Sequence, residues 1–273
     1  MSKEYERLSK ALECVRKKTD FVPRVALILG SGLGDYADGM QVEAVLPYTE
    51  IEGFPKSTVQ GHKGRFVFGY VENVPVVCMQ GRVHYYEGYS TNEVVMPIRL
   101  MKMMGAEVLF LTNAAGGLHN DMKAGDLMMI TDQIACFAPN PLIGENVEEL
   151  GTRFPDMTDL YAARIQNIIR DSASQIGIDL KEGVYCQLTG PSFESPTEVK
   201  LLQMLGGGSV GMSTAIEAIT ARHCGMEICG ISCICNLGAG LSPTPLSHEE
   251  VQKAGAEAAP KFKALVTSVI SKL

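Results

Sequence analysis

Several features are missing from this 273-residue chain, and each absence excludes a class of protein. No hydrophobic run approaches the ~18 residues that span a membrane, and the polar N-terminus lacks the apolar stretch of a signal peptide. The net charge of −7 leaves no basic excess for nucleic acid or an anionic membrane. No internal repeat and no break in composition divides the chain. We therefore expect one cytoplasmic domain over residues 1–273, without a nucleic-acid or membrane partner.

The eight cysteines form no metal-binding or disulfide pattern. There is no C-x-x-C pair, and none of the five histidines has zinc-site spacing to a cysteine. Cys229, Cys233 and Cys235 fall at even intervals along one apolar run, so they would share one face of a strand, and the other cysteines are scattered. The sequence predicts free, mostly buried thiols in a reducing compartment and no metal.

Apolar runs typical of strands alternate with helical segments along the chain. Serines 90, 195 and 247 each begin an S-x-x-E capping pattern, and apolar residues at helical intervals predict a further helix over residues 5–15. This alternation predicts an α/β fold, in which helices surround a mixed, largely parallel sheet that stays open or closes into a distorted barrel. Residues 139–155 lack periodicity and are expected to form a functional loop. The expected strands cover residues 25–29, 66–71, 76–79, 108–112, 127–130, 183–188 and 228–235.

The first expected strand leads into Gly30-Ser31-Gly32-Leu33-Gly34, a turn suited to holding an anion. Such a turn leaves backbone N–H groups unpaired, and glycine allows a charged oxygen to approach closely. The anion could be a dinucleotide pyrophosphate, because Gly32, Gly34 and Ala37 satisfy the G-x-G-x-x-A spacing. That alternative also requires an acidic residue closing a second strand ~20 residues later. Residues 47–55 contain prolines and no such strand, which weakens the dinucleotide alternative.

Polar residues follow the later strands, at the sheet edge where ligands of α/β proteins gather. Arg82, His84 and Tyr86 alternate, so an extended segment would point all three the same way, with a guanidinium suited to phosphate. Residues 112–117 end a strand in small residues and a glycine pair, which is typical of a second backbone cradle. Taken singly, these segments also fit a solvated strand end or a tight turn.

A second set of residues suits a heterocyclic ring. Phe193 and Glu194 place a flat ring beside a carboxylate, which can accept from a ring N–H. Asn236 ends the last apolar run, and its amide can both donate and accept along a ring edge. The bland alternatives are a solvated loop for Glu194 and a turn former at Asn236.

Six motifs in this order resemble the successive motifs of the trimeric, low-molecular-mass purine nucleoside phosphorylases, the family that includes the methylthioadenosine phosphorylases. They are residues 30–34, 61–62, 80–88, 112–117, 190–194 and 211–214. The resemblance implies a homotrimer that cleaves purine nucleosides with inorganic phosphate as co-substrate, giving the free base and ribose 1-phosphate without a metal or redox cofactor. The chain departs from the family pattern at Ala215-Ile216-Glu217, where Val-Pro-Glu is usual.

The resemblance also implies a role for each motif residue. Phosphate would be bound by Ser31, His62, Arg82, His84, Asn113, Ala114 and Ser213. The purine would contact Phe193, Glu194 and Asn236. The ribose would contact Tyr86, Met212, His248 and, from a neighbouring subunit, Phe154. Catalysis would depend on Asn236, Glu194, His84 and His248.

The residue at position 236 is expected to set the substrate. Asparagine favours 6-oxopurine nucleosides such as inosine and guanosine, because the branch that cleaves 6-aminopurine nucleosides carries an aspartate there. A methylthioadenosine or adenosine phosphorylase of the same family is the nearest alternative. An NAD-dependent oxidoreductase and a non-catalytic nucleoside-binding protein are alternatives of other classes.

Overall fold

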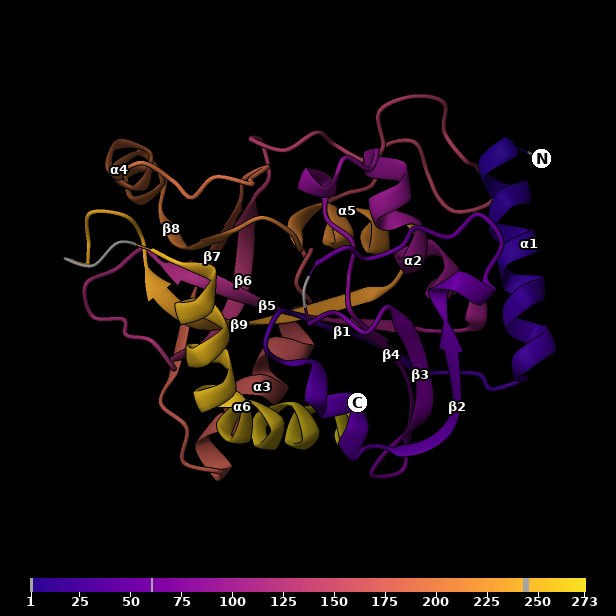
Figure 1. Cartoon of the computed structure of the whole chain (residues 1–273), viewed down its shortest axis with the longest axis horizontal. Coiled ribbons are helices and arrows are strands. Elements are labelled where there is room, and N and C mark those ends of the chain that lie inside the picture. Colours follow the sequence, from indigo (N-terminus) through magenta and orange to yellow (C-terminus); the bar gives the residue numbers. More distant parts are fainter. Residues whose placement is uncertain (1, 60, 243–245) are drawn as a thin grey trace.

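A nine-stranded mixed sheet forms the centre of the protein, seen here in a computed structural model (Figure 1). The structure describes residues 2–59, 61–242 and 246–273, and the side chain of His248 lies outside this description. The strands are β1 (Val25–Leu29), β2 (Gln41–Pro47), β3 (Arg65–Val71), β4 (Val74–Gln80), β5 (Val108–Gly117), β6 (Leu127–Ile134), β7 (Leu180–Gln187), β8 (Gly207–Gly211) and β9 (Glu227–Leu237).

Helices connect several of these strands, and three of them begin at the serines that the sequence indicated. Ser90 and Ser195 each form a reciprocal capping box with the glutamate three residues later. The Ser247 hydroxyl accepts from the N–H of Glu250. The helices are α1 (Lys3–Lys18), α2 (Thr91–Met104), α3 (Ala163–Gln175), α4 (Pro196–Met204), α5 (Ala215–His223) and α6 (His248–Ile270), with 3₁₀ turns η1 (Gly34–Gly39), η2 (Tyr48–Glu50) and η3 (Tyr85–Glu87).

Half of the sheet closes on itself. The strand order is β2-β3-β4-β1-β5-β8-β7-β6-β9, and β9 also pairs in parallel with β5, so β5, β8, β7, β6 and β9 form a closed five-stranded ring. The remaining strands extend from β5 as an open sheet whose β1 pairs in parallel with both β4 and β5. The predicted α/β fold with a mixed sheet is therefore confirmed. Of the two forms that we expected, one half of the sheet closes into a barrel and the other half stays open.

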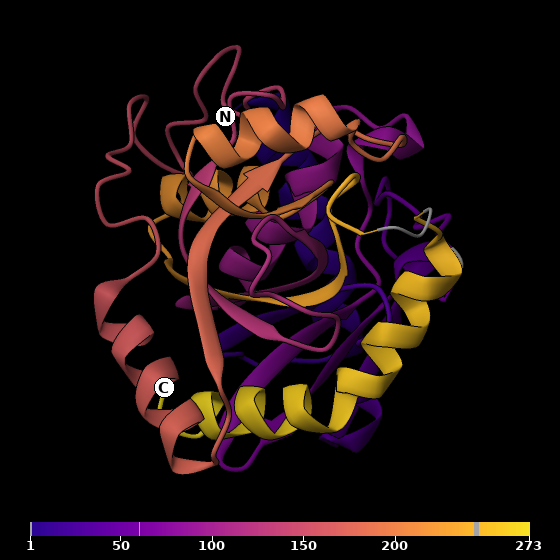
Figure 2. The same cartoon turned by 90° about the vertical axis from the view of Figure 1, so that its left-hand side faces the viewer.

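Helices cover both faces of the sheet. In Figure 1, α1, α2 and α5 lie on one side, and α3 and α6 lie on the other. Two buried apolar clusters separate accordingly, one packed under α1, α2 and α5 and the other under α3 and α6. Figure 2 shows that α6 bends along its length, and Pro260 lies inside it, where a proline removes one backbone hydrogen bond. The two layers leave the carboxyl ends of β1, β4, β5 and β9 free to form a site.

Two strands were missed in the sequence, and both have a physical explanation. The edge strand β2 is only partly buried, its first three residues are exposed, and it ends in a proline, so it lacks the apolar run of a buried strand. The strand β8 contains three glycines, which disfavour an isolated strand. A Cβ at Gly207 would fall 2.5 Å from Cys186 Sγ, so the neighbouring strand fills the space that a side chain would need. Tertiary packing therefore overrides the local propensity of this segment.

The structure also places the cysteines and the aperiodic segment of the chain. Six of the eight cysteines are buried, as predicted, and Cys229, Cys233 and Cys235 all contribute to the core under α3 and α6. Residues 139–155 contain no helix or strand. Among the described helices, none combines the length and apolar character needed to cross a membrane.

Candidate active site

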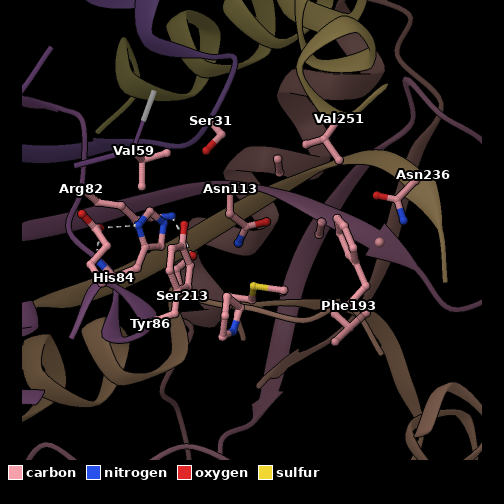
Figure 3. Close-up of a pocket in the computed structure, with 18 of the residues that line it drawn as sticks. Ser31, Val59, Arg82, His84, Tyr86, Asn113, Phe193, Ser213, Asn236 and Val251 are labelled. Carbon is pink, nitrogen blue, oxygen red and sulfur yellow. Dashed lines mark hydrogen bonds and ion pairs between the residues drawn. The ribbon is translucent and has the colours of Figure 1, made fainter. Parts of the chain in front are cut away.

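A cavity of about 530 Å³ opens where β1, β4, β5, β8 and β9 end (Figure 3). It gathers segments that lie more than two hundred residues apart in the sequence, from Ser31 to Val251, and most of them follow strand ends, as predicted. The predicted site residues that line it are Ser31, Arg82, His84, Tyr86, Asn113, Ala114, Phe193, Glu194, Met212, Ser213 and Asn236. In Figure 3 the groups suited to an oxyanion lie at one end, and Phe193 and Asn236 lie at the other.

The turn after β1 brings Ser31 to the cavity. A Cβ at Gly30 would fall 2.6 Å from the Cα of Asn113, so only glycine allows β1 and β5 to approach this closely. Gly34 begins the short 3₁₀ turn η1 and no long α-helix follows the glycines, so the chain lacks the helix N-terminus that a dinucleotide pyrophosphate needs. The G-x-G-x-x-A spacing is therefore coincidental.

His62 lies directly behind Ser31 at this end. Its Nε2 is 3.4 Å from Ser31 Oγ, and its Nδ1 is 3.0 Å from the carbonyl oxygen of Arg82. A carbonyl only accepts, so Nδ1 carries the hydrogen and Nε2 is the acceptor. Burial and the neighbouring His84 lower the pKa of His62 to about 4, so the ring is neutral at pH 7.

Arg82 is a buried cation with a buried partner. The side chains of Arg82 and Glu217 are 1% and 2% exposed, and Arg82 Nη2 lies 3.1 Å from Glu217 Oε2. Arg82 Nε donates to Glu217 Oε1 at 3.2 Å, which fixes the plane of the guanidinium. The remaining nitrogen, Nη1, donates to Ser213 Oγ at 2.9 Å. Glu217 thereby orients Arg82 toward the cavity.

His84 and Tyr86 complete the oxyanion end, although not through the extended segment that we expected. Strand β4 ends at Gln80, and Tyr86 lies in the 3₁₀ turn η3, where the rings of His84 and Tyr86 stack with centroids 4.7 Å apart. His84 Nδ1 lies 3.0 Å from Glu87 Oε1. Burial lowers the pKa of His84 although the hydrogen bond to Glu87 opposes the shift. Burial also opposes ionisation of Glu87, but hydrogen bonds from His84 and Thr58 lower its pKa to about 2.

The opposite end of the cavity carries a carboxylate, an amide and an exposed ring. Glu194 is buried and its pKa is raised, mainly by desolvation. Asn236 Nδ2 donates to the Leu237 carbonyl at 2.9 Å, and among the described residues its second N–H hydrogen has no acceptor. Phe193 remains 40% exposed, which leaves a ring face open to a planar ligand.

Three predicted residues are not placed in the lining of the cavity, and His62, which lies behind Ser31, is the first of them. Phe154 is 87% exposed and does not line the cavity of its own chain. His248 begins α6, but its side chain lies outside the described residues. Val251, one turn further along α6, does line the cavity, so this helix reaches the site.

Sequence reasoning missed several residues of the site. Glu217 and Thr214 lie behind Ser213, and Thr58 and Val59 line the cavity from a loop between β2 and β3. The loop residues carry no periodic or motif signal. Glu217 does carry a motif signal. The two residues before it differ from the Val-Pro-Glu pattern of the family, but the glutamate itself is kept. Within the part of the chain that the structure describes, no group of three or more histidine, cysteine, aspartate or glutamate side chains could hold a metal ion.

Comparison with known proteins agrees with this geometry. Residues 24–271 match the family described as the phosphorylase superfamily. The chain is 46% identical over 263 residues to purine nucleoside phosphorylase 1 of Geobacillus stearothermophilus, covering 96% of each protein. It is 41% identical over 276 residues to the Rattus norvegicus purine nucleoside phosphorylase, covering 98% of this chain and 96% of the rat protein.

Solved structures give the same result. The purine nucleoside phosphorylase of Schistosoma mansoni in complex with adenosine superposes with a TM-score of 0.93 at 38% identity, covering 98% of this chain and 97% of that one. A Schistosoma mansoni purine nucleoside phosphorylase in complex with inosine is also similar, with a TM-score of 0.93 at 37% identity, covering 98% of this chain and 96% of that one. On its full-length match in sequence and in fold, the chain is an enzyme of the phosphorylase superfamily and belongs within it to the purine nucleoside phosphorylases.

Proposed function

We propose that this enzyme cleaves 6-oxopurine ribonucleosides and 2′-deoxyribonucleosides with inorganic phosphate, as a step of purine salvage. The observation that supports it is the division of one cavity into two chemically different ends. One end gathers hydroxyl, imidazole and guanidinium donors from Ser31, His84, Arg82 and Ser213, while the other carries Glu194 and Asn236. The space between them would hold the ribose.

At the oxyanion end, phosphate would be both ligand and nucleophile. Ser31, Arg82, His84, Ser213 and the backbone of Asn113 and Ala114 would hold it, with His62 behind Ser31. A phosphate oxygen forms a bond to C1′ as the C1′–N9 bond breaks, and the bonding electrons pass to the purine. Because the ribose is oxocarbenium-like in the transition state, the phosphate anion stabilises it, and no protein carboxylate is needed as nucleophile.

At the other end, negative charge develops on the purine. Asn236 would share its remaining Nδ2 hydrogen between N7 and O6, and this bond strengthens as charge accumulates, so it favours the transition state over the ground state. Glu194 would accept from N1–H, a hydrogen that 6-oxopurines carry and adenine lacks. Phe193 would lie against the base, with Tyr86, Met212 and His248 against the ribose, His248 at the 5′-hydroxyl. Each such polar contact is worth about 10²- to 10³-fold in rate.

A methylthioadenosine or adenosine phosphorylase is the second candidate. It is favoured by one finding, because a similar solved structure is named as a complex with adenosine. The asparagine at 236 argues against it, since a 6-amino group needs an acceptor and would meet the Nδ2 hydrogens. The family membership leaves no support for the oxidoreductase alternative.

Several further properties are part of this proposal. The enzyme would use no cofactor, with phosphate as its co-substrate, and the whole chain would act as one nucleoside phosphorylase domain. It would work as a homotrimer, because the 87% exposed Phe154 is free to close a neighbouring subunit's sugar pocket. A cytoplasmic location accords with its free, largely buried cysteines.

The test is to incubate the enzyme with inosine, with and without phosphate, and to measure hypoxanthine. Release that depends on phosphate is expected, with ribose 1-phosphate as the second product, and Glu194→Ala should abolish most of it. Equal release without phosphate would identify a hydrolase instead. No release in either mixture, with inosine still bound, would identify a binding protein. A preference for adenosine over inosine would favour the second candidate.

A further inference from the structure

The turn that carries Ser213 to the oxyanion end has an unusual backbone. Thr214, between β8 and α5, has φ 82° and ψ −55°, and the Ala215 N–H donates to the Ser213 carbonyl at 3.0 Å. These values describe a three-residue γ-turn of the rarer, strained kind. A β-branched residue rarely adopts such a positive φ, and it persists only where surrounding contacts hold it. Contacts of the Thr214 side chain, and not the backbone preference of threonine, must therefore hold this turn.

Hydrogen bonds hold the Thr214 hydroxyl on every side. The residue is fully buried, and Oγ1 accepts from Asn113 Nδ2 at 3.0 Å. It lies 3.0 Å from Ser213 Oγ and 3.5 Å from Arg82 Nη1. Asn113 belongs to β5 and Arg82 follows β4, so three separate segments converge on this hydroxyl. Glu217 holds Arg82 from behind, which fixes the guanidinium of this cluster.

The donors and acceptors of this cluster fix the direction of its hydrogen bonds. The amide nitrogen of Asn113 and the guanidinium of Arg82 can only donate. Among the contacts of the described residues, Ser213 Oγ is therefore the acceptor within reach of the Thr214 hydroxyl hydrogen. Ser213 Oγ also accepts from Arg82 Nη1 at 2.9 Å. Both acceptor positions of Ser213 are then occupied, and its own hydrogen is left to donate.

Tyr185 is the remaining hydroxyl near this turn. Burial raises its pKa to about 12, and the charge of Arg82 and the nearby Ser213 and Thr214 only partly offset this, so it stays protonated. Within the described residues Tyr185 Oη has no partner with hydrogen-bond geometry, so Ser213 Oγ, at 3.0 Å, is the better-placed acceptor for the Thr214 hydrogen. Ser213 lines the cavity, whereas Thr214 does not. With its lone pairs engaged in this way, the Ser213 hydroxyl has its hydrogen available to an oxyanion in the cavity.

We propose that Thr214, held by Asn113, is a positioning residue that commits the Ser213 hydroxyl to donate to the bound phosphate. An unconstrained serine hydroxyl can present either its hydrogen or its lone pairs, and lone pairs repel an anion. Orienting the hydroxyl before the phosphate arrives removes this cost, as in other preorganised anion sites. The inference rests on the proposed phosphate position, and it adds the group that fixes the direction of one contact.

Thr214→Val is the variant that tests it, because valine keeps the β-branched shape and the backbone strain but lacks the hydroxyl. The KM for phosphate should rise about tenfold, the loss expected for a weakened hydrogen bond to an ion. The KM for inosine should stay within about twofold, and Thr214→Ser should restore the KM for phosphate, because it retains the hydroxyl. A wild-type KM for phosphate in Thr214→Val, or no recovery in Thr214→Ser, would overturn the proposal. If valine prevents folding, as judged by circular dichroism, Thr214→Ala takes its place with the same expectations.

Combining Thr214→Val with Ser213→Ala separates this inference from the proposed function. If Thr214 acts through Ser213, the second substitution should change the KM for phosphate by less than about twofold once Ser213 is gone. If the double variant instead raises the KM for phosphate by the product of the two separate factors, Thr214 acts independently of Ser213. That result would overturn this inference and leave the proposed function standing. If Ser213→Ala itself leaves the KM for phosphate unchanged, the proposed phosphate position is wrong. The melting-temperature increase caused by inorganic phosphate gives a second readout, which Thr214→Val should reduce.

Discussion

The ion pair of Arg82 and Glu217 determines how charge is arranged at the oxyanion end. Both side chains are almost fully buried, so the guanidinium is already balanced by a carboxylate before any ligand binds. His62 is neutral as well, because its pKa is about 4. The site therefore offers a phosphate directed donors rather than surplus positive charge. This agrees with a protein whose net charge is −7.

The depressed pKa of His62 predicts a loss of stability in acid. The folded protein keeps the ring neutral down to about pH 4, whereas the unfolded chain takes up a proton near pH 6.5. The stabilisation is complete above pH 6.5 and is lost as the pH falls toward 4. Between pH 7 and 5 this costs about 1–2 kcal/mol. Melting temperatures of the wild type and His62→Gln at both pH values measure it.

The glutamine variant cannot take up the proton, so its melting temperature should fall less between pH 7 and 5 than that of the wild type. Glu87 does not interfere, because its stabilising ionisation is lost only below about pH 4.5, toward its pKa of about 2. Equal slopes for the two proteins would contradict the assignment of a neutral, buried His62.

Asn236 carries the prediction about substrate. Asn236→Asp should raise the ratio of kcat/KM for adenosine to that for inosine at least about tenfold, because a carboxylate accepts from a 6-amino group and repels a 6-oxo group. Initial rates with both nucleosides at saturating phosphate measure the ratio. Asn167→Asp, an exposed site on α3, adds the same charge and should leave the ratio unchanged. An unchanged ratio in Asn236→Asp would remove the basis for the 6-oxopurine proposal.

Among the elements, the packing of β1 on β5 determines where the first anion-binding turn lies. A Cβ at Gly30 would lie 2.6 Å from the Cα of Asn113, and this is a backbone atom, which cannot move aside as the end of a flexible side chain could. Gly30→Ala should lower the free energy of unfolding by about 1–3 kcal/mol, as over-packing of a core does. It should also raise the KM for phosphate, because Ser31 and Asn113 are displaced together.

Denaturant unfolding and phosphate kinetics test this prediction together. Gly39→Ala is the matched control, because its Cβ would have nothing within 4 Å and its φ lies outside the positive range. The control should change stability by less than about 0.5 kcal/mol. If both variants behave alike, the close approach of β1 and β5 is not what requires glycine at position 30.

Elements with local signals could be predicted from the sequence, and those without could not. The reciprocal hydrogen bonds of Ser90 and Glu93 join residues only three positions apart, so the signal for the start of α2 lies in the local sequence. The strand β8 is glycine-rich and forms because β7 and β5 pair with it on either side. The strand β8 completes the five-stranded ring only because it pairs with strands that lie far away in the sequence.

At the scale of the whole molecule, the structure of one chain gives no role to the aperiodic loop over residues 139–155. Phe154 and Ile143 both lie in it and are 87% and 76% exposed. Exposed aromatic residues commonly mark an interface. We predict that the enzyme in solution has three times the 29.5 kDa mass of one chain, as measured by light scattering. A monomer that retains full activity would contradict the proposed use of Phe154.

Mixing variants tests whether Phe154 acts in a neighbouring subunit. Phe154→Ala should raise the KM for inosine, and Ile143→Ala, from the same loop, should not. Glu194→Ala should be nearly inactive. Co-expressed Phe154→Ala and Glu194→Ala chains should regain wild-type KM for inosine at a fraction of their sites, because one protomer supplies Glu194 and its neighbour supplies Phe154. No recovery in mixed oligomers would place Phe154 outside the neighbouring site.

The residue types of the site and the alternation of strands and helices are determined by the sequence itself. Serine, arginine, histidine and asparagine follow apolar runs, and both the runs and the capping boxes depend on neighbours within a few residues. The tertiary structure alone decided the closed ring, the extent of β8, the turn at Thr214 and the pairing of Arg82 with Glu217 across 135 positions. These features depend on contacts between distant segments, whose distances and hydrogen-bond partners exist only once the chain has folded.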